Sequence, residues 1–509
     1  MTADTPLLPL LTLHWRRVLA LLFLGFSAGL PILLIFSTLS LWLREAGVER
    51  SAVTFFSWAA LGYSFKFVWA PLVDTLPLPL LSRWLGRRRA WLLVSQVAII
   101  LAILGMAAQD PVTGGLAVLA MAAVALGFSS ATQDIVIDAY RIEIGDTDVQ
   151  ALLSATYIAG YRIGMLVAGA GALYLAAGLG TTSDTYVYNA WATTYQAMAG
   201  CMLIGIATTF MIAEPTHRDQ HSDGYSSRDY ARFLLLFLCI AAAFVASFFV
   251  LSGPIDALKA AWHSGERAGD AVKSFVLGTG RLLIALAVAL GAARTLVRLG
   301  AVSHEMLHTT YIAPVLDFFA RYGRLALWLL VLIGTYRISD IVMGAVSNVF
   351  YADMGYDKET IASVTKVFGL LMTLLGGLLG GLAALRWGVI RMLFLGALLT
   401  AATNVLFMWL ADGDPSVTKL AIVIGADNLS AGLASAAFVA WLSALTNIQF
   451  TATQYAIFSS LMTLFPKLLG GYSGGMVDAV GYSNFFLGSA LLGLPVLMLI
   501  LWLAKRHDV

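Results

Sequence analysis

One stretch decides how this chain folds: Ser129-Ser-Ala-Thr-Gln-Asp-Ile-Val-Ile-Asp-Ala-Tyr-Arg-Ile-Glu143, together with the apolar residues before it. Two carboxylates, Asp134 and Asp138, lie within a run that is otherwise long and apolar enough to cross a bilayer. Because they are four residues apart, they share one face of a helix. An ionisable group at membrane depth costs at least ~2.5 kcal/mol unless it faces protein or water. We therefore expect this face, which Gln133 extends, to line a water-accessible pathway.

The composition of the whole chain agrees with a membrane location. Of its 509 residues, 60% are hydrophobic and 12% are charged, and the mean hydropathy is +0.84, a balance that soluble globular domains do not reach. A net charge of +2 is too small to indicate a nucleic-acid partner. The two cysteines, Cys201 and Cys239, lie in apolar runs and indicate neither a disulfide framework nor a metal site. The first apolar run, 18–43, is too long for the core of a cleavable signal peptide, so we expect a spanning helix there.

Apolar runs of roughly 20 residues, the length that crosses a bilayer as a helix, recur in three groups. The first group comprises 18–43, 52–73, 90–108, 114–140, 151–177 and 189–213. The second comprises 231–252 and 275–299, joined by an amphipathic stretch, Pro254 to Lys273, that we expect to lie at the membrane surface. The third comprises 324–350, 360–385, 389–410, 418–445, 452–476 and 482–504. The sequence thus predicts fourteen spans: an N-terminal six-helix bundle (1–213), a linker with two extra transmembrane helices and an interfacial helix (214–321), and a C-terminal six-helix bundle (322–509).

The cations of the short loops predict the orientation, because Lys and Arg are retained on the cytoplasmic side. If the N-terminus is placed inside, most loop arginines become cytoplasmic, which predicts that both termini lie in the cytoplasm. A weak internal repeat relates 44–54 to 352–362, each of which follows the first span of its bundle. Two parallel six-helix halves are typical of the major facilitator architecture, in which the substrate binds between halves that rock against each other.

Further polar residues lie deep within the predicted spans and indicate a wide, hydrated cavity for a large polar solute. Lys66 is placed at a depth similar to that of Asp134, and we expect the two to pair. Asp134, with Asp138 and Lys66, is our candidate for the group that takes up a proton, while a static buried ion pair is the alternative. Arg162 falls near the middle of the fifth span, where its planar guanidinium suits a carboxylate. The residues expected to contact the substrate or to gate the halves are Gln133, Tyr161, Arg162, Gly29, Arg337, Asp340, Lys366, Asp427 and Asn428.

The loop between the second and third spans carries Asp74, then Leu76-Pro-Leu-Pro79, then Arg87, Arg88 and Arg89. It resembles the facilitator loop pattern of glycine, aspartate and a basic cluster, although the turn is lengthened here. The resemblance implies a cytoplasmic latch held by ion pairs. Charges that only determine topology are the alternative.

No constellation of catalytic residues is recognisable. The seven histidines have no second ligand at zinc spacing, apart from His304 and His308, which lack a third. No phosphate-binding glycine loop with its lysine is present, which argues against transport driven by ATP. We therefore expect no enzymatic activity, no metal and no cofactor other than a proton gradient. A membrane-embedded enzyme for lipid-linked sugars and a receptor that binds without transport remain alternatives.

Several blocks of sequence resemble one known family. They are Gly25-Phe-Ser-Ala-Gly-Leu-Pro31, Phe65-Lys-Phe-Val-Trp-Ala-Pro71, Gly86-Arg-Arg-Arg-Ala-Trp91, Gln133-Asp-Ile-Val-Ile-Asp-Ala139, Gly160-Tyr-Arg-Ile-Gly-Met-Leu166, Ser435-Ala-Ala-Phe-Val-Ala440 and Phe450-Thr-Ala-Thr-Gln-Tyr455. Together they resemble the AmpG-type muropeptide permeases, bacterial members of the major facilitator superfamily, over nearly the whole chain. The stretch 214–321 matches no motif of that family.

The resemblance implies import of 1,6-anhydromuramyl peptides, and of their N-acetylglucosamine disaccharide form, across the inner membrane of a Gram-negative bacterium, driven by the proton gradient. Such import feeds cell-wall recycling and, indirectly, β-lactamase induction and antibiotic resistance. The partners implied are a small-molecule substrate and membrane lipid, with no nucleic acid, and the expected functional form is a monomer. The related acetyl-coenzyme A transporters are the alternative within the superfamily.

Overall fold

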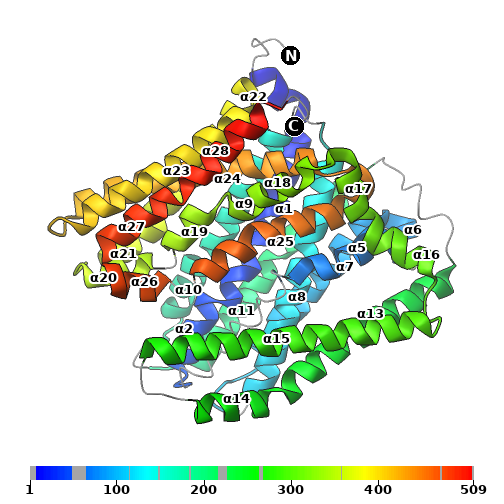
Figure 1. Cartoon of the computed structure of the whole chain (residues 1–509). Helices are drawn as coiled ribbons and strands as arrows, with labels where there is room; N and C mark the ends of the chain where they lie inside the picture. Colours follow the sequence, from blue (N-terminus) through cyan, green and yellow to red (C-terminus); the bar gives the residue numbers. More distant parts are fainter. Residues whose placement is uncertain are drawn as a thin grey trace. The chain divides into compact units, whose positions relative to one another are not determined.

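A computed structural model of the chain consists of helices, turns and loops, with no strand among the residues it describes (Figure 1). The described residues are 7–48, 63, 65–78, 80–113, 115–146, 149–182, 185–215, 226–262, 267–344, 346–356, 358–470 and 473–506. They fall into two compact units, of which the first comprises Met1–His217 with Phe318–Val509 and the second Arg218–Asp317. The prediction of an all-helical fold is confirmed for the described part of the chain.

The N-terminal half of the first unit is a set of long helices joined by short turns. Its α-helices are α1 (Leu7–Ile35), α2 (Ser37–Glu45), α5 (Ala70–Thr75), α6 (Leu81–Leu85), α7 (Arg87–Ala107), α8 (Leu116–Glu143), α9 (Gln150–Leu166), α10 (Ala172–Gly178), α11 (Tyr188–Cys201) and α12 (Leu203–Met211). A 3-10 turn, η2 (Lys66–Val68), precedes α5, and a π-helical turn, η3 (Val167–Gly171), joins α9 to α10. Gly86 precedes α7 with a φ of 89°, which favours glycine, so the chain turns sharply and begins α7 at Arg87.

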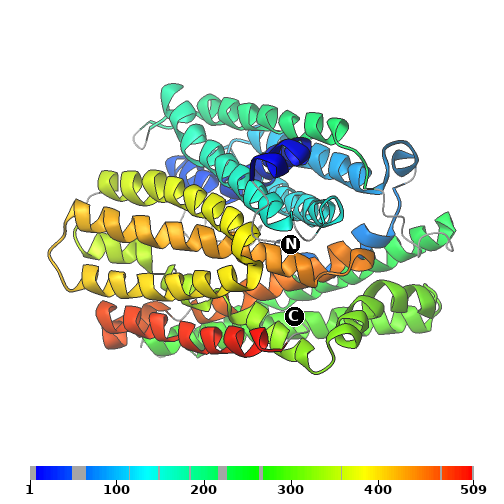
Figure 2. The ribbon, with the colours of Figure 1, turned by 90° about the horizontal axis from the view of Figure 1, so that it is seen from above.

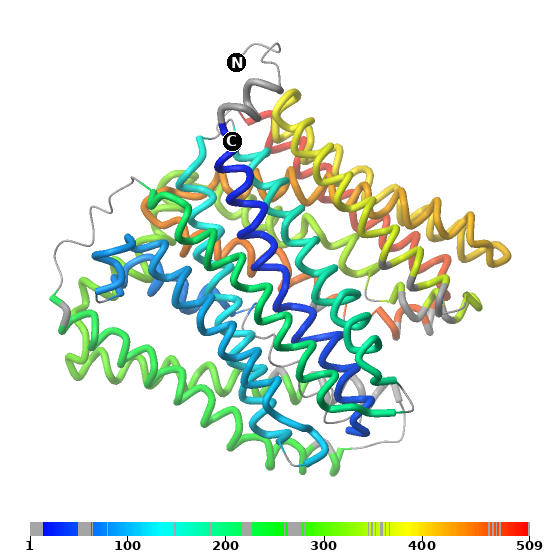
Figure 3. Tube along the Cα trace, turned by 180° about the vertical axis from the view of Figure 1, so that it is seen from behind, coloured from blue at the N-terminus to red at the C-terminus, as the bar shows by residue number. Residues whose placement is uncertain are grey.

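The C-terminal half of the first unit is built in the same way. Its α-helices are α18 (Leu325–Thr335), α19 (Ile338–Gly344), α20 (Ser347–Asp353), α21 (Lys358–Ile361), α22 (Gly369–Trp387), α23 (Val389–Ala411), α24 (Val417–Leu445), α25 (Thr451–Gly470), α26 (Ser473–Val480), α27 (Tyr482–Leu491) and α28 (Gly493–Ala504). A π-helical segment, η5 (Ala362–Phe368), leads into α22, and a 3-10 turn, η6 (Ile448–Phe450), leads into α25. Figure 2 shows the N-terminal helices, blue to teal, on one side and the C-terminal helices, yellow to red, on the other. The N-terminal part of α1 that is drawn in colour and the end of α28 lie at the same end of the unit (Figure 3).

The second unit consists of α13 (Ser227–Val250), α14 (Ser252–Ala261), α15 (Arg267–Arg298), α16 (His304–Leu307), the π-helical turn η4 (His308–Ile312) and the first part of α17 (Ala313–Tyr322). α13 and α15 pack along each other. Ser226 begins α13 with a capping box, in which its side chain accepts from the Asp229 N–H and the Asp229 carboxylate accepts from the Ser226 N–H. The expected interfacial stretch, Pro254 to Lys273, covers most of α14, residues 263–266 outside the described part and the start of α15, and its position at a membrane surface stays a prediction.

Eleven helices within the described residues are long and apolar enough to cross a membrane. They are His14–Glu45, Arg87–Ala107, Leu116–Glu143, Gln150–Gly178, Arg228–Leu258, Val276–Arg298, Leu325–Gly344, Ser363–Trp387, Val389–Ala411, Val417–Leu445 and Tyr482–Ala504. Of the other three predicted spans, 52–73 falls largely on residues outside the described part, as do residues 49–54 of the internal repeat. The span 189–213 is interrupted at Met202, and 452–476 is divided between α25 and α26. The total of fourteen spans and the cytoplasmic termini therefore stay predictions.

Glycines let the helices within each half approach backbone to backbone. Where α1 crosses α9, a Cβ atom at Gly29 would lie 1.9 Å from the Tyr161 carbonyl oxygen, and one at Gly160 would lie 2.0 Å from that of Leu22. Where α22 crosses α24, a Cβ atom at Gly376 would lie 2.0 Å from the Leu429 carbonyl oxygen. No side chain fits at these distances, so small residues are required for the crossings.

Candidate transport site

A network of charged and polar side chains joins the two halves of the first unit at one end of their helices. Arg88, in the first turn of α7, is fully buried. Its Nη2 donates to Asp74 Oδ1 at 2.9 Å and to Glu143 Oε1 at 2.5 Å. The same nitrogen donates to Thr451 Oγ1, at the start of α25 in the other half, at 2.8 Å. Arg88 Nε also donates to both carboxylate oxygens of Glu143, at 3.1 Å, so the contact with Glu143 uses two nitrogens of the guanidinium. Bidentate, charge-assisted contacts are the strong ones in proteins.

Asp74 extends the network by capping α25. Its Oδ1 accepts from the Ala452 N–H at 3.1 Å, and its Oδ2 accepts from the Thr453 N–H and the Thr453 hydroxyl, both at 2.7 Å. The first N–H groups of a helix have no partner within the helix and carry its positive dipole end. A carboxylate from the N-terminal half thus satisfies the helix start of the C-terminal half.

The four residues of the predicted latch are only partly brought together. Asp74 meets Arg88, and Arg87 Nη1 donates to the main-chain oxygen of Asp74. Arg89 instead donates to the carbonyl oxygens of Thr209 and Phe210 at the end of α12, both at 3.0 Å, so its bonds stay within the N-terminal half.

Sequence reasoning missed Glu143, Thr451, Thr453 and Glu214 in this network. Glu143 ends the stretch that begins at Ser129. Its charge at a predicted helix end was the one feature of the sequence that could have indicated its place in the network. Glu214 accepts from the N–H groups of Arg88 and Arg89, at 2.8 and 3.1 Å, and so caps α7. Burial raises the pKa of the Glu214 carboxyl, while these two N–H groups act in the opposite direction.

A second group of charges lies deeper, on α8 and on η2. Lys66 Nζ lies 3.5 Å from Asp138 Oδ2, and Arg141 Nη2 lies 3.5 Å from Asp138 Oδ1. Lys66, Asp134 and Asp138 are all buried. The expected pair of Lys66 with Asp134 is therefore replaced by a pair with Asp138, although the charge of Asp134 still interacts with both. Asp134 Oδ1 is buried and accepts no hydrogen bond from the described part of the chain.

Gln133 and Gly29, both predicted to contact substrate, lie at helix contacts. Gln133 is fully buried, and its Nε2 lies 3.4 Å from the hydroxyl of Ser27 on α1. Gly29 faces the backbone of Tyr161. In this conformation both residues position α1 against α8 and α9, and their contact with a solute stays a prediction. Tyr161 is half-buried, and its ring lies 6.1 Å from that of Tyr157.

Arg162 brings a cation from the N-terminal half toward charges of the C-terminal half. The hydrogen bond described for its guanidinium is to the thioether of Met165, at 3.7 Å, which is a weak acceptor. Its charge interacts with those of Arg337 and Asp340. Arg337 lies where α18 breaks before α19, and its Nη2 is 2.5 Å from Asp340 Oδ2. Broken helices at membrane depth are a feature of substrate sites in transporters.

Asp427 and Asn428 extend this group on α24. Asp427 Oδ1 accepts from the Thr403 hydroxyl at 3.0 Å, and its charge interacts with that of Asp340. Asn428 Oδ1 accepts from the Thr373 hydroxyl at 2.9 Å, which ties α24 to α22. Both side chains are half-buried. The side chain of Lys366, the remaining predicted residue, lies outside the described part of the structure.

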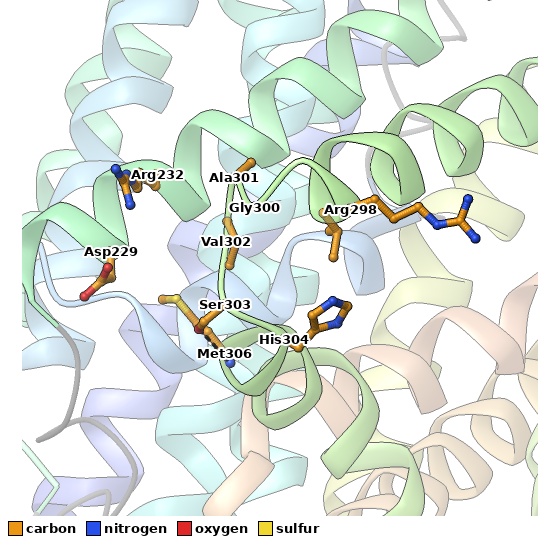
Figure 4. Close-up of a pocket in the computed structure, with 10 residues that line it drawn as sticks. Asp229, Arg232, Arg298, Gly300, Ala301, Val302, Ser303, His304 and Met306 are labelled. Carbon is orange, nitrogen blue, oxygen red and sulfur yellow. Dashed lines mark hydrogen bonds between the residues drawn. The ribbon is translucent and has the colours of Figure 1, made fainter.

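The second unit has a separate pocket of about 440 Å³ at the ends of α13 and α15 (Figure 4). Its walls are Asp229, Arg232, Val297, Arg298, Gly300, Ala301, Val302, Ser303, His304 and Met306. None of the predicted site residues lies here. Figure 4 shows the Arg232 and Arg298 side chains extending to opposite sides, so the two cations do not converge on one point.

Similarity to known proteins agrees with this arrangement. Residues 17–212 match the family model described as Acetyl-coenzyme A transporter 1. The chain is 31% identical over 493 residues to a putative transporter AmpG 4 of Rickettsia felis, covering 97% of this chain and 98% of that protein. This chain belongs to the AmpG family of transporters. The AmpG-type resemblance of the sequence blocks is therefore confirmed. An anhydromuropeptide permease of Escherichia coli K12 is 29% identical over 487 residues, covering 95% of this chain and 79% of that protein.

Solved structures establish the fold of this AmpG-family chain. The proton:xylose symporter XylE bound to 6-bromo-6-deoxy-D-glucose matches with a TM-score of 0.59 at 13% identity, covering 95% of this chain and 94% of that one. The transporter FucP in the outward conformation matches with a TM-score of 0.58 at 11% identity, covering 97% and 98%. Both belong to the major facilitator superfamily, and the fold predicted from the sequence is confirmed to that extent. The family and fold make the chain a multi-pass membrane transporter for a small molecule.

Proposed function

We propose that this transporter imports 1,6-anhydromuramyl peptides, including their N-acetylglucosamine disaccharide form, by proton symport for cell-wall recycling. The observation that carries the proposal is the guanidinium of Arg162, which lies within a span, has a thioether contact to Met165, and interacts through its charge with Arg337 and Asp340 of the other half. A peptide-bearing sugar acid presents carboxylates, amides and hydroxyls, which need cations and acceptors together. The name of the E. coli relative supports this substrate class.

Asp134 is the proposed site of proton uptake. A buried carboxylate that accepts no hydrogen bond is costly to keep ionised, so a conformation that leaves Asp134 Oδ1 unbonded favours the neutral acid. Asp138 is already shared by Lys66 and Arg141. Uptake of one proton by Asp134 therefore leaves Asp138 with both of its cationic partners, which supports Asp134 as the coupling carboxylate.

The end at which the halves are joined indicates which side of the proposed site is closed. We propose that this end, with Asp74, Arg88 and Glu143, faces the cytoplasm of a Gram-negative inner membrane, as the loop cations predict. The conformation described here is then closed toward the cytoplasm and receives solute and proton from the periplasm. The halves 1–213 and 322–509 would rock about the substrate, with fourteen spans in all, both termini in the cytoplasm and a monomer as the working form.

Uptake by proteoliposomes tests the proposal. Labelled anhydromuropeptide should accumulate when a proton gradient is imposed and should stop accumulating when an uncoupler is added. Asp134→Asn should lose this accumulation yet retain exchange of internal for external solute, which needs no net proton movement. Asp110→Asn, which alters a loop carboxylate bonded to Tyr186, is the matched control and should behave like the unchanged protein. Gradient-driven accumulation by Asp134→Asn at the unchanged rate would eliminate Asp134 as the proton site.

Acetyl-coenzyme A is the second candidate substrate, favoured by the family model that matches residues 17–212. Competition separates the two, since only the true substrate should reduce labelled uptake when added in unlabelled form. The same vesicles test the other classes of function. An enzyme would deliver a chemically altered solute to the lumen, which mass analysis detects, and a receptor would bind the solute without flux.

A further inference from the structure

Arg141 is a fully buried guanidinium that touches both halves of the first unit. It lies in the last turn of α8, and its Nη1 donates to the hydroxyls of Ser154 on α9, at 2.8 Å, and Ser443 on α24, at 2.7 Å. The guanidinium also lies over the ring of Tyr455 on α25, 5.1 Å from its centroid. These contacts place one cation at the junction that closes the proposed cytoplasmic end.

Among the described residues, one carboxylate forms an ion pair with the same guanidinium. Its Nη2 lies 3.5 Å from Asp138 Oδ1, while the other oxygen of Asp138 lies 3.5 Å from Lys66. Nε and Nη2 of Arg141 donate no hydrogen bond to any described residue. One anion is thus shared by two buried cations, and neutralising it would leave both uncompensated.

We propose that Arg141 is a positioning residue that couples the charge of Asp138 to the contact with Ser443, so that proton uptake in this cluster opens the end closed by Asp74 and Arg88. The inference rests on the proposed proton symport and adds the step by which the proton reaches the gate. The proton binds a carboxylate oxygen, and no other covalent bond changes. The uncompensated guanidinium is then drawn toward water, which it reaches only when the halves part.

Other ionisable groups interact with the Asp138 carboxylate, so their charges also depend on its protonation. They are Asp134 on α8, Lys66 on η2, Tyr157 and Tyr161 on α9, and Tyr455 on α25. A proton that enters at Asp134 lets Lys66 remain with Asp138, whereas a proton on Asp138 frees both cations. The contact between the halves is therefore expected to open when the proton is on Asp138. Among these groups, Arg141 is the one that bonds across the halves to Ser443.

Distance measurements between spin labels test this coupling without any substrate. The labels are placed at Asp146 and Gln449, which are exposed beside Glu143 and Thr451 respectively, after replacing the two cysteines by serine. In lipid nanodiscs, the parent should show a larger open population at about pH 5 than at about pH 8. Arg141→Gln should abolish this dependence, changing by less than about twofold over the range. Ser443→Ala should raise the open population at every pH and weaken the dependence, and Arg141→Lys should retain part of the dependence that Arg141→Gln loses.

A double-mutant cycle keeps the test decisive even if one variant folds poorly. Asp138→Asn mimics the protonated state and should stay open at about pH 8, while adding Arg141→Gln should return it toward the closed parent, because the uncompensated cation is removed. Loss of pH dependence in the parent itself would overturn the proton symport proposed above. Two results would overturn the role of Arg141 and leave the proton symport standing. One is an Arg141→Gln variant whose open population depends on pH as strongly as that of the parent. The other is a double variant with as large an open population as Asp138→Asn.

Discussion

Replacing Asp74 by asparagine is expected to shift the protein toward the state in which the proposed cytoplasmic end is open. The Asp74 carboxylate takes three hydrogen bonds from the first turn of α25 and one from Arg88. An asparagine retains one carbonyl oxygen, but its amide group would face the N–H and hydroxyl of Thr453 in place of the second oxygen. The contact between the halves would lose its charge and at least one of its hydrogen bonds.

The size of the shift follows from those bonds. A hydrogen bond to a charged group contributes about 1.5–3 kcal/mol net. Loss of one such bond between the halves would raise the ratio of open to closed protein by about 10- to 150-fold, since 1.36 kcal/mol corresponds to a factor of ten. Thr453→Val, which removes the hydroxyl and leaves the N–H, should produce a smaller change in the same direction.

Amide hydrogen exchange in lipid nanodiscs measures this shift directly. The N–H groups of Ala452 and Thr453 are protected by Asp74, so a peptide that contains the start of α25 should exchange faster in Asp74→Asn. Asp353→Asn is the matched control, because that carboxylate bonds to Tyr482 within the C-terminal half. Unchanged exchange at the start of α25 in Asp74→Asn would refute the assignment of Asp74 as a cap between the halves.

Three further changes have defined outcomes. Gly160→Ala should lower the unfolding temperature, at a cost of about 1–3 kcal/mol for overpacking, because its Cβ would lie 2.0 Å from the Leu22 carbonyl oxygen, whereas Gly200→Ala, with nothing within 4 Å, should not. Arg162→Gln should weaken binding of a solute carboxylate at least tenfold in equilibrium binding, as loss of a charged hydrogen bond of about 1.5–3 kcal/mol predicts, and should affect an amidated solute little. Glu214→Gln should flatten the pH dependence of the unfolding temperature above about pH 4.3: burial raises the pKa of Glu214 in the folded state, so the folded protein binds this proton more tightly and loses stability as the pH rises.

The sequence predicted the helices and the depth of their charges better than it predicted which charges meet. Asp134 and Asp138 lie buried on one helix, as their four-residue spacing indicates. Lys66 pairs with Asp138 and not with Asp134. The two carboxylates are four residues apart on α8, about 6 Å along the helix axis at 1.5 Å per residue, and the sequence does not fix the depth of Lys66 on its own segment more closely than that. A shift of one helical turn is enough to exchange the two partners.

Gln133 shows a second limit of sequence reasoning. It adjoins Asp134 in the chain, but successive residues on a helix point about 100° apart, so Gln133 turns to Ser27 on α1. The partners of Asp74 were also beyond local patterns. Ala452 and Thr453 donate their backbone N–H groups to Asp74, which lies more than 370 positions earlier in the chain. No side chain at a helix start indicates which distant carboxylate will cap it.

The chemistry of the contacts separates what stays fixed from what moves. Within each half, α1 meets α9 and α22 meets α24 through glycines whose substitution would collide with backbone atoms, so these pairs cannot slide without losing close packing. Between the halves, the described contacts include polar side chains and one helix cap, which water can replace when they part, beside a small apolar cluster of Ala151 with Ala384 and Ala437. Gly381 is a glycine contact between the halves, with a Cβ position 2.5 Å from that of Ala155. Because Gly381 lies at the closed end, a larger residue there would act against closure while leaving both helix pairs intact. A rocking mechanism requires this difference between rigid contacts within each half and separable contacts between the halves.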